Sequence, residues 1–217
     1  MRTNEPDYAR RLSRLESAWW KRLLDVQRPY RLHLRRLALG RVLDLGCGLG
    51  RNLANLGATG AVGVDHNAES VAIARARGFE AFTVEAFAAS PHAAPGTFDA
   101  LLLSHVVEHL AREQAAALLR TYLDCLRPGG RVVLITPQEA GHRSDPTHER
   151  FVGFAEAREL VESLGLTVQA QYSFPFARPV GRVFRYNEFV TIARKQPAGA
   201  GDAPACDGGR VAIGQSE

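Results

Sequence analysis

Cysteine is scarce in this chain, and its scarcity removes whole classes of fold and site. The three cysteines, Cys47, Cys125 and Cys206, are far apart and odd in number. Such spacing supports neither a disulfide framework nor a Cys-x-x-Cys metal site. Long apolar runs are also missing, since no stretch approaches the roughly 18 apolar residues of a membrane helix. Because the N-terminus is too charged for a signal peptide, we expect a cytoplasmic protein with no membrane partner.

The composition that is present suits one globular domain. Hydrophobic residues make up 46% of the 217 residues, and this length is common for a single domain. The net charge of +4 is uneven, because residues 1–41 hold 11 Lys and Arg against 4 Asp and Glu. A basic segment can bind an anionic partner such as nucleic acid. The solvated faces of one or two helices explain the same charges, and we favour that interpretation.

Short apolar segments alternate with helical patterns, and this alternation predicts the fold class. We expect an α/β, doubly wound, Rossmann-like fold: a mostly parallel seven-stranded sheet with helices on both faces and a helical N-terminal cap. The predicted strands are 41–45, 61–64, 79–84, 98–103, 131–135, 166–173 and 183–193. The predicted helices begin with one near Asn4 and continue at about 29–39, 51–57, 68–77, 111–126 and 154–164.

Residues 42–50, Val-Leu-Asp-Leu-Gly-Cys-Gly-Leu-Gly, form the most informative stretch. Its three glycines lie between a strand pattern and a helical pattern. Glycine allows a tight turn whose backbone can approach a ligand closely, and the start of the helix adds amides at the same place. The second strand pattern ends in Asp65, whose carboxylate is suited to accept ribose hydroxyls. Together these features predict a nucleotide site.

The spacing Gly-x-Gly-x-Gly, with an acid two positions before it, resembles the first motif of class I S-adenosylmethionine (SAM) methyltransferases. It differs from the dinucleotide pattern Gly-x-Gly-x-x-Gly. Residues 98–103 and 126–134 resemble the fourth and fifth strands of that family, so the resemblance covers about 40–195 and implies SAM as cofactor. The cofactor contacts that we infer are Asp44, Gly46, Cys47, Gly48, Gly50, Asp65, His66, Glu85, Ala86, Ser104 and His105.

The segment 104–109 follows the predicted fourth strand, where strand ends face the ligand crevice. It carries three candidate metal ligands, His105, Glu108 and His109. Ubiquinone-biosynthesis O-methyltransferases resemble this stretch with a cation-binding Glu-x-x-Glu-His, in which His105 replaces the first Glu. The implied ion is Mg²⁺ or another divalent cation, and a site without metal is the alternative. A metalloprotease of the His-x-x-Glu-His type is disfavoured, because that motif requires a long helix.

The segment 142–150 follows the fifth strand at the same edge and is rich in ionisable residues. Histidine has a pKa near 6.5, which suits it as a base at neutral pH. We therefore interpret His148 as the base that takes a hydroxyl proton, with Asp145 orienting it or helping a cation. His109 is the third catalytic candidate. A surface loop with salt bridges is the alternative.

The function expected from these features is SAM-dependent O-methylation of a small polar acceptor, with a sugar or oligosaccharide preferred. Arg178, Arg182 and Arg185 are suited to hold an anionic or polyhydroxylated acceptor, and Tyr186, Asn187 and Glu188 offer hydrogen bonds. The loop 145–148 and the segment 186–189 resemble small actinobacterial sugar O-methyltransferases, including that of methylmannose polysaccharide assembly.

Three alternatives remain open at the level of sequence. They are methylation of N or O in another small metabolite, a nucleic-acid-binding methyltransferase-like protein, and a SAM-binding partner subunit without activity. Nucleic acid is the less favoured partner, and a homodimer is left open. The expected organisation is a cap at 1–40, a SAM-binding methyltransferase domain at 41–195 and a disordered tail at 196–217.

Overall fold

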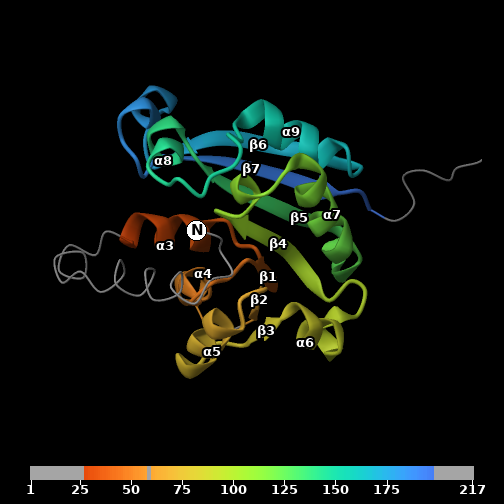
Figure 1. The fold of residues 1–217 in the computed structure, drawn as a ribbon. Helices are drawn as coiled ribbons and strands as arrows, with labels where there is room; N and C mark the ends of the chain where they lie inside the picture. The colour runs from red at the N-terminus through yellow and green to blue at the C-terminus, as the bar shows by residue number, and fades with distance from the viewer. Residues whose placement is uncertain (1–26, 58–59, 198–217) are drawn as a thin grey trace, which may run out of the picture.

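The computed structural model describes residues 27–57 and 60–197, and in these ranges the predicted α/β fold is confirmed (Figure 1). Seven strands form one sheet in the order β3-β2-β1-β4-β5-β7-β6. The first five strands in this order are parallel, and β7 is antiparallel to both β5 and β6. The strands are β1 (Val42–Leu45), β2 (Ala61–Asp65), β3 (Ala81–Thr83), β4 (Phe98–Ser104), β5 (Leu126–Pro137), β6 (Leu166–Phe174) and β7 (Glu188–Lys195).

Helices cover both faces of the sheet (Figure 1). One core cluster includes Leu34, Leu53 and Val71 and lies beneath α3 (Arg28–Arg36), α4 (Arg51–Leu56) and α5 (Ala68–Ala76). The other includes Leu119 and Leu160 and lies beneath α6 (Val84–Ala88), α7 (Arg112–Tyr122) and α9 (Phe154–Glu162). The remaining helical elements are short: η1 (Pro91–Ala93), η2 (Val107–His109), η3 (Leu123–Cys125), α8 (Glu139–Arg143) and η4 (Arg178–Arg182).

Strand β4 shows why a parallel central strand has a continuous apolar sequence. Leu101 and Leu103 belong to one core cluster, whereas Ala100 and Leu102 belong to the other. All four residues are fully buried. Successive side chains of a strand point to opposite faces, so a strand covered on both sides needs apolar residues at every position.

The strand order reverses beside β1, since β2 and β4 flank it on opposite sides. In open α/β sheets ligands bind outside the carboxyl ends of the strands at such a switch point. The glycine turn after β1, Asp65 at the end of β2 and Ser104 at the end of β4 all lie at this edge. The fold therefore brings the predicted site residues to one rim.

Several predicted boundaries were wrong, each for a local reason. The helix predicted at 111–126 ends at Tyr122, because residues 123–125 form a 3-10 turn and Leu126 pairs with Phe98 of β4. Helix α3 ends at Arg36, before Gly40, and Ala38 already has a left-handed φ of 46°.

The last strand begins at Glu188, five residues later than predicted. The side chain of Asn187 holds the preceding loop, since it accepts a hydrogen bond from the Phe176 amide at 2.9 Å and donates one to the Phe176 carbonyl at 3.2 Å. Residues 183–187 therefore belong to the connection rather than to the sheet. No helix within the described ranges has both the length and the apolar character required to cross a membrane.

Helix α3 is the described part of the predicted N-terminal cap, and it packs on the end of β6. The His33 ring stacks on Phe174 at 4.1 Å and lies 2.7 Å from the Tyr172 hydroxyl. Tyr30 donates to the Tyr186 carbonyl at 2.7 Å. The helix predicted near Asn4 and the part of the predicted tail beyond 197 lie outside the described residues.

Candidate active site

The turn between β1 and α4 is shaped by three glycines with positive φ: 76° at Gly46, 51° at Gly48 and 84° at Gly50. A Cβ atom at Gly46 would lie 2.5 Å from Val106, and one at Gly50 would lie 2.5 Å from Phe79. A Cβ at Gly48 would meet nothing within 4 Å. Two glycines are thus required by close packing, and the third faces open space that a ligand can occupy.

Backbone amides of this turn donate hydrogen bonds to backbone carbonyls of the protein. Gly46 and Cys47 both donate to the Val64 carbonyl, and Gly50 donates to the Cys47 carbonyl. The Cys47 side chain packs beneath the turn, since its Sγ lies 2.6 Å from where a Gly63 Cβ would be. Burial raises the pKa of this thiol above its usual range. We infer that Cys47 supports the turn, whereas the sequence assigned it to cofactor contact.

Asp65 connects the end of β2 to the glycine turn. Its two carboxylate oxygens accept hydrogen bonds from the Gly48 and Asn67 amides, each at 2.8 Å. A carboxylate oxygen has two lone pairs, so each can accept a further hydroxyl. The open space above Gly48 and this anchored carboxylate fit the ribose of SAM. His66 beside it has an exposed side chain, with Nδ1 3.5 Å from Asp65.

Glu85 and Ala86 lie in the first turn of α6, directly after β3. Thr83 caps this helix by accepting a hydrogen bond from the Ala86 amide at 3.3 Å. Thr83 pairs in register with Asp65 in the neighbouring strand. Both predicted cofactor contacts are exposed and lie at the rim beside Asp65.

Asp44 is buried in β1, and its Oδ2 atom has no hydrogen-bond partner. Burial raises the pKa of this carboxyl to about 7, although an Asn52 hydrogen bond and the Arg51 charge oppose the shift. The native state therefore holds a proton that the unfolded chain releases near pH 4. Unfolded protein binds fewer protons in this window, so the free energy of unfolding falls as pH rises from about 4 to about 7.

We predict that Asp44→Asn removes this component of the pH dependence. Urea unfolding of both proteins between about pH 5 and pH 8 measures it, and the wild-type curve should fall more steeply up to about pH 7. Identical slopes for the two proteins would contradict the assignment. The comparison uses slopes because the substitution itself changes the absolute stability.

His105 lies between two carboxylates at the end of β4. Its Nε2 is 2.9 Å from Glu188, and its Nδ1 is 3.2 Å from Glu108. Burial alone would lower the pKa of His105, but hydrogen bonds and charges of Glu108 and Glu188 raise it to about 9. Both ring nitrogens are engaged, so His105 is not available as the metal ligand that the sequence suggested. Its φ of 59° is unusual for a residue other than glycine.

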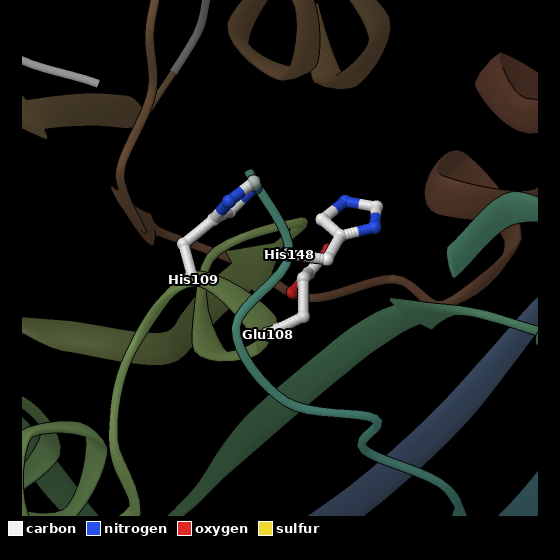
Figure 2. A group of neighbouring side chains, drawn as sticks. All are labelled: Glu108, His109 and His148. Atoms are coloured by element: carbon white, nitrogen blue, oxygen red, sulfur yellow. The ribbon is translucent and has the colours of Figure 1, made fainter. Parts of the chain in front are cut away.

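The loop after β5 is fastened to the end of β4 through Glu108. The amides of Glu149 and Arg150 donate to the Glu108 carbonyl at 2.9 Å and 3.1 Å. This attachment brings His148 next to Glu108 and His109 (Figure 2). One ligand atom from each of these three residues lies within 4.8 Å of the other two. The predicted base and two of the predicted metal ligands thus form one group.

Backbone carbonyls orient both imidazoles of this group. Nδ1 of His109 lies 3.0 Å from the Thr147 carbonyl, and Nδ1 of His148 lies 2.9 Å from the His142 carbonyl. Because a carbonyl can only accept, Nδ1 carries the hydrogen in each ring and Nε2 presents a lone pair. The sequence assigned the orientation of His148 to Asp145, but here a carbonyl has that role.

Asp145 acts through the turn instead. Its Oδ1 accepts hydrogen bonds from the amide and the hydroxyl of Thr147, at 3.0 Å and 2.8 Å. This Asx turn holds the carbonyl that orients His109. The sequence placed Asp145 near the rim as a polar residue. Only the path of the loop shows that it supports the ring of His109, through Thr147, and not the ring of His148.

Sequence reasoning misplaced two residues near the start of β7. Asn187 is fully buried and bonded to the loop 176–177, so it stabilises the connection and does not face an acceptor. Glu188 was grouped with acceptor contacts, yet its carboxylate holds His105. Arg178 forms an ion pair with Glu139 and lies over the Phe189 ring, which leaves Arg182 and Arg185 exposed at the rim.

Comparisons with known proteins identify relatives of this chain among methyltransferases. Residues 9–185 match the family model described as a methyltransferase domain. A ubiquinone biosynthesis O-methyltransferase from Xanthomonas euvesicatoria is 30% identical over 139 residues, which cover 56% of this chain and 57% of that protein. A tRNA (carboxymethyluridine(34)-5-O)-methyltransferase from Macaca fascicularis is 34% identical over 103 residues, which cover 46% of this chain and 15% of that protein.

The fold is also found among solved structures. A SAM-dependent methyltransferase from Archaeoglobus fulgidus aligns with a TM-score of 0.56 and 21% identity, covering 80% of this chain and 99% of that one. The chain spans little more than half the length of the first curated relative that it matches. The family match nevertheless covers most of the chain, including the glycine turn, Asp65 and His148. This protein therefore belongs to the methyltransferase-domain family and has the fold of SAM-dependent methyltransferases.

Proposed function

We propose that this protein transfers the methyl group of SAM to a hydroxyl of a small polar acceptor, with a sugar or oligosaccharide as the leading class. One observation carries the proposal: two imidazoles whose Nδ1 atoms bond backbone carbonyls lie at the strand edge that also holds the glycine turn and Asp65. A hydroxyl nucleophile needs a base, whereas a neutral amine does not. The oriented pair is therefore more consistent with an oxygen acceptor.

Asp65 and the surface above Gly48 hold the ribose in this proposal, and Glu85 lies where the adenine would sit. SAM supplies an electrophilic methyl group on a sulfonium and leaves as S-adenosylhomocysteine. The chain contributes mainly by placing the two partners in line. As the acceptor oxygen gains the methyl group, its proton moves to Nε2 of His148, whose ring is held through Nδ1 by the His142 carbonyl.

The acceptor class is argued from the rim of the site. Arg182, Arg185 and Tyr186 are exposed there, next to the loop that Asn187 holds in place. Guanidinium groups and a phenol offer many hydrogen bonds to a polyhydroxylated or anionic molecule. The two curated relatives are both named as O-methyltransferases, which supports oxygen as the acceptor atom. The resemblance to actinobacterial sugar methyltransferases supports a sugar.

We also propose that residues 1–40 act as a cap over the methyltransferase domain at 41–195, with residues 196–217 as a tail. The described part of the cap supports this division. Tyr30 of α3 donates to the Tyr186 carbonyl at the acceptor rim, and Glu188 and Arg51 are close enough to influence its pKa. Helix α3 therefore borders both the loop at Tyr186 and α4.

The direct test is incubation of the purified protein with methyl-labelled SAM and a panel of mannosides, other sugars and phenols. We expect label in a sugar ether, located by mass spectrometry of the product. Wild-type protein without an acceptor is the control for self-labelling and SAM breakdown. Label found only in phenols would contradict the sugar assignment, and label found only on nitrogen would contradict O-methylation.

A further inference from the structure

We propose that Glu108, His109 and His148 bind one divalent transition-metal ion of the Zn²⁺ and Co²⁺ class in preference to Mg²⁺. The inference deepens the proposed function, since it concerns the same group of side chains. It differs from the metal site suggested by sequence in two ways. The third ligand is His148 from the loop after β5, and His105 is not a ligand.

Glu108 provides the strongest indication of a missing partner. Its side chain is fully buried, and its Oε2 atom has no hydrogen-bond partner within the described structure. The other oxygen pairs with His105, whose Nδ1 lies 3.2 Å from Oε1. A buried carboxylate is costly unless it is paired and hydrogen-bonded or coordinates a metal. The Oε2 atom in particular is available for coordination.

The two histidines have the arrangement of metal ligands. Each Nδ1 donates to a backbone carbonyl, Thr147 for His109 and His142 for His148, at 3.0 Å and 2.9 Å. Metal-binding histidines almost always donate their second ring N–H in this way, which fixes the tautomer and orients the ring. The two rings are 4.8 Å apart between centroids. Both lone pairs can thus point at one ion.

The spacing of the group requires only a small adjustment. The three ligand atoms lie within 4.8 Å of one another, whereas the ligands of one tetrahedral ion at about 2.0–2.2 Å lie roughly 3–3.5 Å apart. Rotation of the imidazoles about their side-chain bonds can close this gap. Figure 2 shows Glu108 and His109 on the segment that follows β4, and His148 on the loop that follows β5.

The donor set selects the class of ion. Two imidazole nitrogens and one carboxylate suit Zn²⁺, Co²⁺ and similar ions, whereas Mg²⁺ prefers oxygen ligands in octahedral geometry. Three protein ligands also leave a coordination position for a water or a substrate oxygen. A bound ion would supply Lewis acidity toward an acceptor hydroxyl. With an ion bound, His148 would act as its ligand, and the acceptor proton would leave to solvent instead of moving to Nε2 of this residue.

The test uses full-length protein without a histidine tag, treated with chelator and then titrated with Co²⁺. We expect visible ligand-field bands that saturate at one equivalent and disappear on addition of Zn²⁺. Calorimetry should show Zn²⁺ binding at least about 100-fold tighter than Mg²⁺. His148→Ala and His109→Ala should each weaken Zn²⁺ binding by at least about 100-fold. The matched control is His92→Ala, because His92 bonds Glu80 and Arg41 away from the site.

Circular dichroism and thermal unfolding verify that each variant is folded, and the two histidine variants are independent in case one is not. Absence of the cobalt bands, bands unchanged in both histidine variants, or tighter binding of Mg²⁺ would each overturn the proposal. Failure here is separable from failure of the proposed function. Protein that methylates an acceptor but shows no cobalt bands would contradict the metal site only, whereas stoichiometric Zn²⁺ binding without methylation of any acceptor would contradict the proposed function only.

Discussion

His148→Ala should lower kcat by about 10²–10⁴-fold while leaving the Kd for SAM nearly unchanged. The imidazole presents Nε2 at the rim and is held through Nδ1 by the His142 carbonyl. We propose that this nitrogen either removes the proton of the acceptor hydroxyl or binds the metal ion that lowers the pKa of that hydroxyl. The alanine variant can perform neither role. Asp65, which is proposed to bind the ribose, lies at the end of β2 and not in the loop that carries His148. The affinity for SAM is therefore expected to stay close to that of the wild type. Single-turnover kinetics and calorimetry measure the two quantities separately.

His92→Ala is the control for this experiment as well. It removes the same side chain from η1, where His92 pairs with Glu80 and with Arg41 next to the amino end of β1. Its kcat should match that of the wild type. A His148→Ala enzyme with normal turnover would eliminate both proposed roles of the residue. A variant that loses SAM affinity instead would show that the loop supports the cofactor site.

Asp65→Ala should raise the Kd for SAM by about 10²–10⁴-fold. The carboxylate is proposed to accept both ribose hydroxyls, and a hydrogen bond to a charged group contributes about 1.5–3 kcal/mol. Two such bonds correspond to about 3–6 kcal/mol, or two to four powers of ten in affinity. Calorimetry with SAM and with S-adenosylhomocysteine measures the loss, which should be similar for both ligands.

Asp65 also anchors the Gly48 and Asn67 amides, so the substitution affects the turn itself. Asp65→Asn is the companion variant, because it keeps the shape of the side chain while one of its two terminal atoms can no longer accept. It should bind SAM more weakly than the wild type and more tightly than Asp65→Ala. Glu69→Ala, an exposed acid in the first turn of α5, is the matched control. Wild-type affinity in both Asp65 variants would exclude the ribose contact.

Local patterns predicted the sheet and the position of the glycine turn well. Strand β4 is apolar at successive positions because both of its faces are covered, which a sequence displays directly. The glycine turn was recognisable because its positive φ values and tight contacts leave glycine as the residue that fits. Boundaries were predicted less well where an apolar segment such as 123–126 suits either a helix or a strand.

The sequence by itself determined the fold class and the edge of the sheet at which the predicted site residues lie, because strand periodicity, glycine spacing and the Asp65 position act over short stretches of chain. Tertiary structure alone decided how the ionisable residues are grouped. His105 pairs with Glu188, 83 positions away, and His109 is oriented by the Thr147 carbonyl, 38 positions away. Such partners are set by the path of the loop after β5 and by the antiparallel entry of β7. No local pattern encodes them, since a side chain's spacing along the chain does not specify which distant backbone group it will meet.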